Sequence, residues 1–250
     1  MGKHPFFIAR RYLLLTRRGY REITMRIMSY NLRKHAAAAE IEQRAERWEP
    51  DVVCLQEANV EELPTSVAGL RLAAATDRNR LGLAMYYRES SFRFVESVSM
   101  GLKKSLHDIV LKPAHERLLG VQLYDIDASR EITIASFHAA PLTALNSLRR
   151  NQIRSALQAL EALGPGTPTF MVGDYNYPVF KERLAGEIRE HGYDMTLSDS
   201  RTYTRYRFFK GHYDFVTSRG LSIGEVKTLP QGTSDHLPIL IDAEYRRHSR

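Results

Sequence analysis

The chain has 250 residues, 43% of them hydrophobic and 26% charged, which is typical of an ordinary globular protein and not of a disordered or fibrous one. No run approaches the roughly 18 apolar residues of a membrane-spanning helix, and the single cysteine, Cys54, excludes an internal disulfide framework and favours a reducing, cytoplasmic location. The net charge of +7 is weak support for a polyanion partner, because most of it lies in the first 24 residues.

Residues 1–24 form a basic extension that we expect to lie outside the globular domain. Six basic residues and one acid there make up +5 of the net charge, so the rest of the chain is nearly neutral. The apolar runs in the extension are three or four residues long, shorter than the roughly 7–15 of a signal peptide. Three interpretations stay open: a disordered or dispensable tail, a segment lying on an anionic membrane surface that would make the protein membrane-peripheral, and a nucleic-acid contact. Met25 is an alternative start.

After Met25, short apolar runs alternate with helix-forming stretches and turn residues. Periodicity predicts strands at residues 26–30, 51–56, 83–87, 92–99, 118–124, 132–137, 169–172, 212–217, 222–229 and 237–242. It predicts helices at residues 35–48, 141–163 and 181–190. No internal repeat or linker interrupts this pattern, which therefore predicts one α/β domain over residues 25–250, built on mixed sheets.

Carboxylate, amide and imidazole side chains stand at the ends of several predicted strands. They are Asn31, Glu57, His138, Asp174 with Asn176, Asp214 within HYDFV, and Asp235 with His236 before the last strand. One such residue alone is usually a turn or structural residue. Strand ends are rigid platforms on which ligand groups converge, so the repetition predicts a functional site.

The residue types in this set favour metal-assisted hydrolysis. Carboxylate and amide oxygens such as those of Glu57 are hard ligands suited to Mg²⁺, which proteins hold through one or two carboxylates together with substrate phosphate. Zinc is disfavoured because the histidines lack paired ligand spacing and cysteine is unavailable. The sequence contains no GxSxG elbow, Walker loop or dinucleotide-binding glycine fingerprint.

The motifs SYNLR, LQE, FHAAP, GDYN, HYDFV and SDHLP together resemble the endonuclease/exonuclease/phosphatase superfamily, which has the DNase-I-like fold. They occur in the order of that family and span residues 26–241. The resemblance implies a four-layer α/β sandwich in which two packed mixed sheets are flanked by helices. It also implies an Mg²⁺-dependent phosphoesterase, with Mn²⁺ as an alternative ion.

The resemblance assigns the metal and phosphate ligands by position. Asn31 and Glu57 would bind the metal, with Glu57 as the principal ligand, and Asp235 would support the metal and its water. Arg117, in HERLLGVQL, falls where some relatives place a phosphate-binding arginine.

The resemblance also assigns the catalytic roles. Asp174 would orient or deprotonate the attacking water, and Asn176 would hydrogen-bond the phosphate or its neighbours. Asp214 would orient the imidazole of His236 toward the scissile phosphate. His138 would stabilise phosphate charge or protonate the leaving group. A phosphodiester is anionic and resists attack. Its hydrolysis therefore needs positive charge near the phosphate oxygens, an activated water and a stabilised leaving group.

Some segments depart from the family pattern or stay ambiguous. DNase-I-type nucleases carry a tyrosine and a glutamate before the strand that here reads LGLAMYYRE, but residues 80–83 offer neither, so His138 is expected to lack its carboxylate partner. The basic loop 103–117 is either a substrate-reading element or simply solvated. Aromatic residues in RTYTRYRFFKG either stack on bases, enter lipid or belong to the core; they are Tyr203, Tyr206, Phe208 and Phe209.

Three functions are compatible with these observations. The first is a nuclease that cleaves DNA or RNA by metal-assisted attack of water. The second is a phosphatase or phospholipase-type enzyme of the same superfamily, acting on phosphoinositide, sphingomyelin-like or small phosphate substrates. The third is a non-catalytic protein that binds membrane or nucleic acid, which the filled catalytic positions disfavour. No obligate protein partner is evident.

Overall fold

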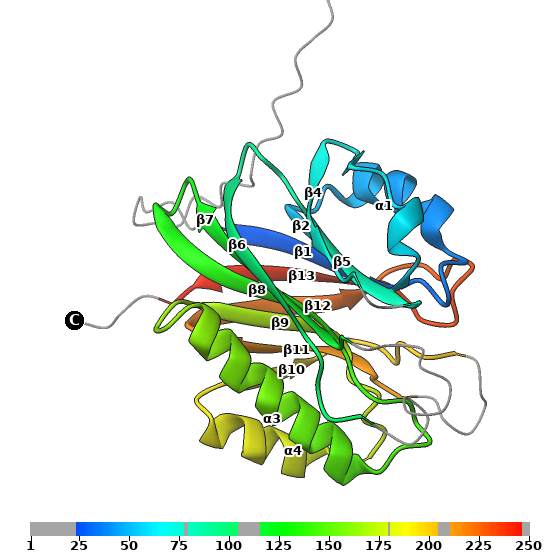
Figure 1. Cartoon of the computed structure of the whole chain (residues 1–250), viewed down its shortest axis with the longest axis vertical. Helices are drawn as coiled ribbons and strands as arrows, with labels where there is room; N and C mark the ends of the chain where they lie inside the picture. Colours follow the sequence, from blue (N-terminus) through cyan, green and yellow to red (C-terminus); the bar gives the residue numbers. More distant parts are fainter. Residues whose placement is uncertain (1–23, 78–79, 105–115, 180, 205–210, 247–250) are drawn as a thin grey trace, which may run out of the picture.

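The computed structural model describes residues 24–77, 80–104, 116–179, 181–204 and 211–246. Two β-sheets pack face to face and helices cover their outer faces, which gives four layers (Figure 1). The expected α/β sandwich with two mixed sheets is confirmed. Residues 1–23 of the basic extension lie outside the described residues, as do residues 105–115 of the basic loop and the aromatic residues Tyr206, Phe208 and Phe209.

The first sheet has seven strands in the order β12, β13, β1, β2, β5, β4, β3. Their bounds are β1 Thr24–Asn31, β2 Val52–Ala58, β3 Ser66–Val67, β4 Leu70–Ala75, β5 Gly82–Tyr87, β12 Leu221–Thr228 and β13 Ile239–Tyr245. β1 and β2 are parallel, and the other neighbours are antiparallel. The carboxyl ends of β1 and β2 therefore meet at one edge, which carries Asn31 and Glu57.

The second sheet has six strands in the order β10, β11, β9, β8, β7, β6. Their bounds are β6 Phe92–Met100, β7 Leu118–Asp125, β8 Arg130–His138, β9 Thr169–Asp174, β10 Asp194–Leu197 and β11 Asp214–Arg219. β8 and β9 form its parallel pair, and the remaining pairs are antiparallel. His138 and Asp174 are the last residues of these two parallel strands, and Asp214 is the first residue of the antiparallel β11.

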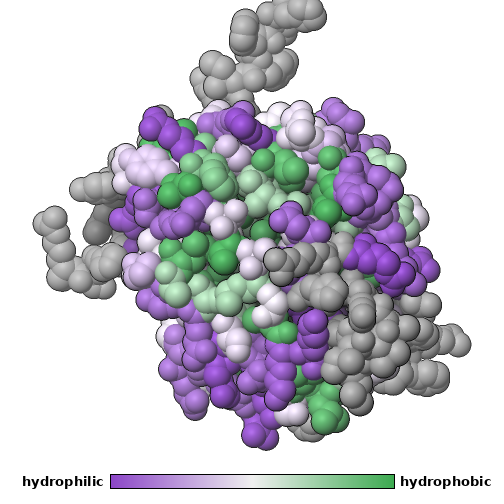
Figure 2. Space-filling model, viewed as in Figure 1, coloured by the Kyte–Doolittle hydropathy of each residue, from purple (hydrophilic) through white to green (hydrophobic). Residues whose placement is uncertain are grey.

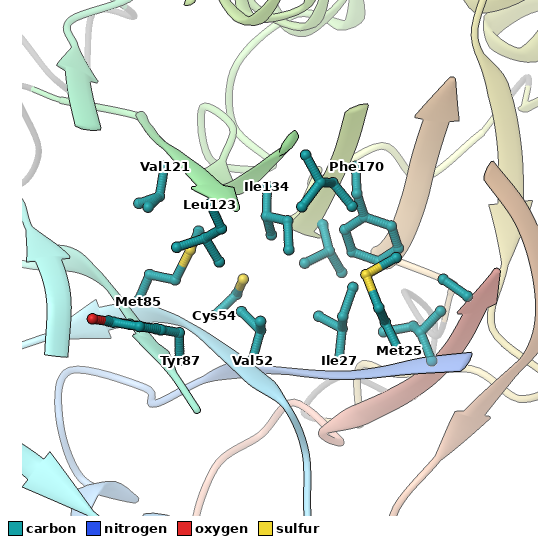
Figure 3. Packing of buried hydrophobic residues seen from close by; sticks show 14 of the residues in the cluster. Met25, Ile27, Val52, Cys54, Met85, Tyr87, Val121, Leu123, Ile134 and Phe170 are labelled. Carbon is teal, nitrogen blue, oxygen red and sulfur yellow. The ribbon is translucent and has the colours of Figure 1, made fainter. Parts of the chain in front are cut away.

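The main core fills the space between the two sheets. Figure 3 shows Met25, Ile27, Val52 and Cys54 of the first sheet packed against Val121, Leu123, Ile134 and Phe170 of the second. None of these eight side chains is exposed to solvent. Each buried aliphatic or aromatic side chain contributes about 1.5–3 kcal/mol, so the strands that carry the site are firmly anchored. Cys54 is a core residue, and burial raises the pKa of its thiol.

Amphipathic helices cover the outer faces of the sheets. α3 Asn146–Leu163 and α4 Lys181–Glu190 pack on the second sheet through residues such as Leu157 and Ile188. α1 Ile41–Trp48 packs on the first sheet through Ile41 and Ala45. The outward surface over α3 and α4 is mostly hydrophilic, as expected for such helices (Figure 2). Among the described helices, none is both long and apolar enough to cross a membrane.

Two helices begin later than the sequence predicts. The helix predicted from residue 35 begins at Ile41, after a short 3₁₀ turn at Ala38–Glu40, because residues 33–35 all have positive φ. The helix predicted from residue 141 begins at Asn146, since the preceding backbone is hydrogen-bonded to side chains of α3 itself. Strands β3, β4 and β10 were not predicted. β3 has two residues, and β4 is rich in alanine, which has low strand propensity.

Candidate active site

Three of the predicted site residues stand side by side in the second sheet. Asp174 of β9 is paired in register with His138 of β8 on one side and with Asp214 of β11 on the other. From the first sheet, Asn31 donates a hydrogen bond from Nδ2 to Oδ2 of Asp174 at 3.1 Å. This bond joins the two sheets at the edge where their strand ends meet, so both sheets contribute to one site.

Asp174 is the centre of the hydrogen-bond network and is only 2% exposed. Its Oδ1 accepts the backbone N–H of Asn176 at 2.9 Å, and its Oδ2 accepts Nδ2 of Asn176 at 3.1 Å. Nε2 of His236 lies 3.6 Å from the same Oδ2. Burial raises the pKa of Asp174 to about 7, against the opposing effect of the nearby His236. A carboxyl that titrates near neutral pH is suited to act as a general base.

His236 and Asp214 form a buried pair. Nδ1 of His236 lies 2.8 Å from Oδ2 of Asp214, and both residues are at most 6% exposed. Burial opposes the charged imidazolium, but the carboxylates of Asp214 and Asp174 outweigh it and raise the pKa of His236 to about 10. The ring of Tyr203 packs on the imidazole, with centroids 4.9 Å apart. His236 is therefore a cation at neutral pH, held in one orientation.

His138 is the neutral imidazole of the site. Burial lowers its pKa to about 4. Its Nε2 lies 3.8 Å from Oε1 of Glu57 and 3.7 Å from Oδ2 of Asp174. Its Nδ1 is buried and has no hydrogen-bond partner among the residues that the structure describes. From the segment that lacks the expected glutamate, Leu81 lines the pocket instead.

Glu57 occupies a strained position beside the site. It lies where the register between β2 and β5 shifts, and its backbone is left-handed, with φ 55°. Bulges of this kind re-aim side chains near active sites, and left-handed backbone in residues other than glycine concentrates at functional sites. Oε2 of Glu57 accepts the backbone N–H of Lys34 at 2.8 Å. This contact fixes the carboxylate in one orientation.

The donor atoms around Glu57 fit a hard divalent cation. The carboxylate of Glu57 is partly exposed, and the amide Oδ1 of Asn31 accepts the backbone N–H of Arg33 at 2.9 Å. Carboxylate and amide oxygens are the ligands that Mg²⁺ and Mn²⁺ prefer. A second group could also hold an ion by distance alone: ligand atoms of Asp174, Asp214 and His236 lie within 4.8 Å of one another. The protonated imidazole argues against that second group, because a histidine ligand must be neutral.

The backbone conformation explains the residue at each end of the GDYN motif. Gly173 has φ +146°, and a Cβ there would lie 2.0 Å from the carbonyl oxygen of Phe137 in the neighbouring strand. Only glycine permits this close approach, which brings β8 and β9 together just before His138 and Asp174. Asn176 is left-handed, with φ 48°, and its backbone N–H turns back to Asp174. The motif thus builds a sharp turn around the central carboxylate.

Buried side chains hold the segment that follows His138. Arg117, predicted to bind phosphate, is 3% exposed and donates from one terminal nitrogen to the carbonyls of His138 and Ala139 at 2.9 and 2.7 Å. Arg149 of α3 is 1% exposed and donates to the carbonyls of Ala140 and Pro141 at 3.2 and 2.9 Å. Four successive carbonyls are therefore capped by two guanidinium groups. The phosphate contact of Arg117 stays a prediction.

Sequence reasoning missed Arg149, although a signal for it was present. The residue lies four positions before Ile153, on the face of the predicted helix 141–163 that also carries Ala156 and Leu160. Charged residues are almost never fully buried unless their hydrogen bonds are satisfied. An arginine on the apolar face of a predicted helix thus indicates a polar group to be capped in the core. Leu145, just before the helix, is 75% exposed.

The loop that carries Asp235 and His236, residues 230–236, is tied to the first sheet and α1. The carboxylate of Glu40 accepts the backbone N–H of Thr233 at 2.6 Å and the guanidinium of Arg44 at 2.7 Å. Ser234 donates from Oγ to the carbonyl of Asn31 at 2.7 Å. Burial alone would raise the pKa of Glu40, but the hydrogen bonds from Thr233 and Arg44 outweigh it and lower the pKa to about 2. The ionised carboxylate of Glu40 therefore anchors this loop.

Replacing Glu40 with glutamine is expected to lower the free energy of unfolding at pH 7 by about 1–2 kcal/mol. Because the folded-state pKa is depressed, the carboxylate stabilises the fold fully above its ordinary pKa of 4.5 and loses that effect as the pH falls toward about 2. Urea unfolding at a series of pH values measures this: the difference between wild type and variant should shrink over that window. Glu46→Gln, at an exposed position of α1, is the matched control. A pH-independent difference would contradict the assignment.

The site opens into a pocket of about 650 Å³. Of the nine predicted site residues, seven line it: Glu57, Arg117, His138, Asp174, Asn176, Asp235 and His236. The other two, Asn31 and Asp214, are bonded to Asp174 and His236. The structure thus brings all nine together. The carboxylate of Asp235 lies 3.7 Å from Nε of Arg33, a cation of this pocket that the sequence reasoning did not single out.

Comparisons with known proteins agree with this geometry. The sequence model of the Endonuclease/Exonuclease/phosphatase family matches residues 28–236. This range contains all nine predicted site residues and ends at the last of them, His236. No curated protein matches the chain by sequence.

Solved structures share the fold across nearly the whole chain. A Bacteroides thetaiotaomicron protein of the endonuclease/exonuclease/phosphatase family has a TM-score of 0.73 at 14% identity, covering 91% of this chain and 100% of that one. Mannosyl-6-phosphatase of the same organism has a TM-score of 0.70 at 15% identity, covering 88% and 99%. D. rerio TDP2 complexed with a single strand DNA product has a TM-score of 0.69 at 15% identity, covering 88% and 98%. Identities this low show the fold alone.

Proposed function

The chain belongs to the endonuclease/exonuclease/phosphatase family, and we propose that it is a divalent-metal-dependent phosphodiesterase that cleaves DNA or RNA. We assign the activity to residues 25–250. One observation carries the proposal: the buried carboxylate of Asp174 contacts both Asn31 and the Asp214–His236 pair, and His138 lies close to both Asp174 and Glu57. Members of this family are phosphoesterase hydrolases, so the arrangement is interpreted as a centre for attack of water on phosphorus.

The metal, which we propose to be Mg²⁺ with Mn²⁺ as a substitute, would be held by Glu57 and Asn31, with Asp235 near it. When bound, it would supply positive charge to the phosphate oxygens. The site residues supply the remaining functions. Asp174, with its raised pKa, accepts a proton from the attacking water.

The two histidines act on the phosphate in different protonation states. His236 is an imidazolium at neutral pH and stabilises the negative charge that develops on the phosphate oxygens. His138 is neutral and donates a hydrogen bond from Nε2 to the phosphate or the leaving oxygen. Its lowered pKa makes it a hydrogen-bond donor at pH 7 and not a cationic acid. Buried hydrogen bonds from Arg117 and Arg149 to the following segment keep this donor in place.

A phosphatase acting on a small monoester is the second candidate. The likeness to a mannosyl-6-phosphatase supports it, because one fold serves both chemistries. A nucleic-acid substrate is favoured by the likeness to TDP2, whose structure holds a single strand DNA product. It is also favoured by the similarity of FHAAP to the corresponding segment of DNase-I-type nucleases.

A substrate panel tests the proposal. The purified protein is assayed with Mg²⁺ or Mn²⁺ on plasmid DNA, single-stranded DNA, RNA, inositol phosphates, sphingomyelin and mannose 6-phosphate. We expect cleavage of at least one nucleic acid, abolished by a chelator and restored by the metal. Turnover of the monoesters or lipids alone would replace the nuclease by the second candidate. No turnover of any substrate would leave a non-catalytic function.

A further inference from the structure

The turn after β1 has an unusual backbone. Arg33, Lys34 and His35 are consecutive residues with φ 48°, 54° and 68°. Left-handed backbone is strained for a residue that is not glycine, and such residues normally occur singly. Three in a row therefore persist only because surrounding contacts impose them.

The contacts that impose this turn come from the end of β2. Glu57 accepts the backbone N–H of Lys34 with Oε2 and the backbone N–H of His35 with its carbonyl, both at 2.8 Å. Nδ1 of His35 accepts the backbone N–H of Asn59 at 2.9 Å. The turn is thus bound to Glu57, which itself carries a carboxylate of the site. These bonds fix the backbone of Lys34 relative to the catalytic centre.

The turn separates two neighbouring pockets. One is the site pocket, and the other has a volume of about 880 Å³ and lies between the turn and residues 59–62 and 75–81. Lys34, Ala36 and Leu81 line both pockets, so these three residues form the boundary that the two pockets share. Lys34 is exposed, and among the residues that the structure describes its ammonium group makes no ion pair. Its neighbour Arg33, in contrast, is paired with Asp235.

We propose that Lys34 forms a second phosphate subsite, which binds the phosphate next to the scissile one in a polynucleotide. The proposal rests on the nuclease function above and names its substrate class: a phosphodiester chain of several nucleotides, and not a single phosphate ester. A lone phosphate would be served by the cations inside the site pocket. A chain that leaves this pocket across the turn passes Lys34 first.

The second pocket fits the rest of such a chain. Its lining includes three carboxylates, Glu61, Glu62 and Asp77, and the guanidinium of Arg80, together with the polar groups of Asn59 and Thr76. The carboxylates would repel a phosphate, so we expect the phosphate at Lys34, on the boundary with the site pocket. The sugar and base, which carry hydrogen-bond donors and acceptors without charge, fit the space beyond it.

The test compares substrates of two sizes. Lys34→Asn removes the charge while keeping a residue that tolerates left-handed φ, and Lys34→Arg keeps the charge. The measured quantity is kcat/KM for an oligonucleotide of about 12 nucleotides, divided by kcat/KM for bis-p-nitrophenyl phosphate. We expect Lys34→Asn to lower this ratio about tenfold. Lys34→Arg should restore most of the ratio. Lys227→Asn, at a position on β12 away from the site, is the matched control and should leave the ratio at the wild-type value.

Binding gives an independent readout. Fluorescence anisotropy measures binding of the same oligonucleotide, single-stranded and labelled, in a chelator at several salt concentrations. For Lys34→Asn the slope of log K against log salt should be smaller by about 0.7. An unchanged ratio and slope, or an equal fall for both substrates, would overturn the subsite. If the wild-type protein cleaves the small diester but neither binds nor cleaves oligonucleotides, the nuclease function itself fails, and the subsite with it.

Discussion

Replacing His236 with asparagine is expected to lower kcat for a phosphodiester about 10³-fold, with a much smaller change in KM. The variant removes the only imidazolium that the described part of the site holds between two carboxylates, Asp214 and Asp174. That cation faces charge that develops during attack on phosphorus, so its loss weakens the transition state more than the ground state. Steady-state kinetics on the best nucleic-acid substrate of the panel, with saturating Mg²⁺, measure the effect.

Asp214, the hydrogen-bond partner of His236, is tested in the same way. Asp214→Asn leaves the imidazole in place but removes the carboxylate that accepts its Nδ1–H at 2.8 Å. A loss of about 10²-fold in kcat is expected, and the double variant should be little worse than His236→Asn, because the two residues act as one unit. The control is His212→Asn. That histidine is bonded to Ser198 outside the site, and its loss should leave kcat at the wild-type value. Multiplicative losses in the double variant would contradict the pair.

The sequence predicted the strand platform and the side chains on it, because both depend on local patterns. Apolar runs such as residues 51–56 mark buried strands, and a polar residue at the end of each run marks the site edge. Gly173 and Asp174 could be predicted together, since the motif needs a glycine where two strands approach closely. Each parallel pair then brings two strand ends together, and the hydrogen bond from Asn31 to Asp174 joins the two pairs.

The features that the sequence did not predict depend on tertiary contacts. His35, the last residue of the left-handed turn, was predicted to start a helix, because nothing local shows that Glu57 will bind the backbone of this turn. Arg149 reads as part of an ordinary amphipathic helix until the carbonyls that it caps are known. Glu40 likewise acquires its role from Thr233, 193 positions later in the chain. Local sequence patterns therefore predicted the reacting groups. The residues that position these groups could be identified only from the fold.

Replacing Glu57 with glutamine is expected to weaken Mn²⁺ binding more than about 100-fold, because it neutralises the principal ligand. Isothermal titration calorimetry of the purified protein measures the affinity directly, without any need for turnover. Glu96→Gln, an exposed position on the edge strand β6, is the matched control and should bind Mn²⁺ as the wild type does. Activity of Glu57→Gln should fall in parallel and recover in part at high metal concentration.

The same titration distinguishes the two groups that could hold the ion. If the ion lay among Asp174, Asp214 and His236, then Asp214→Asn would lose it and Glu57→Gln would largely keep it. We expect the reverse, because the carboxylate of Asp214 is already occupied by the Nδ1–H of His236, and an imidazole whose pKa is raised to about 10 carries a proton where a metal would bind. Glu57 has one oxygen fixed by Lys34 and the other directed toward the pocket beside His138. Retention of Mn²⁺ by Asp214→Asn and its loss in Glu57→Gln would therefore place the ion at the end of β2 and not among Asp174, Asp214 and His236.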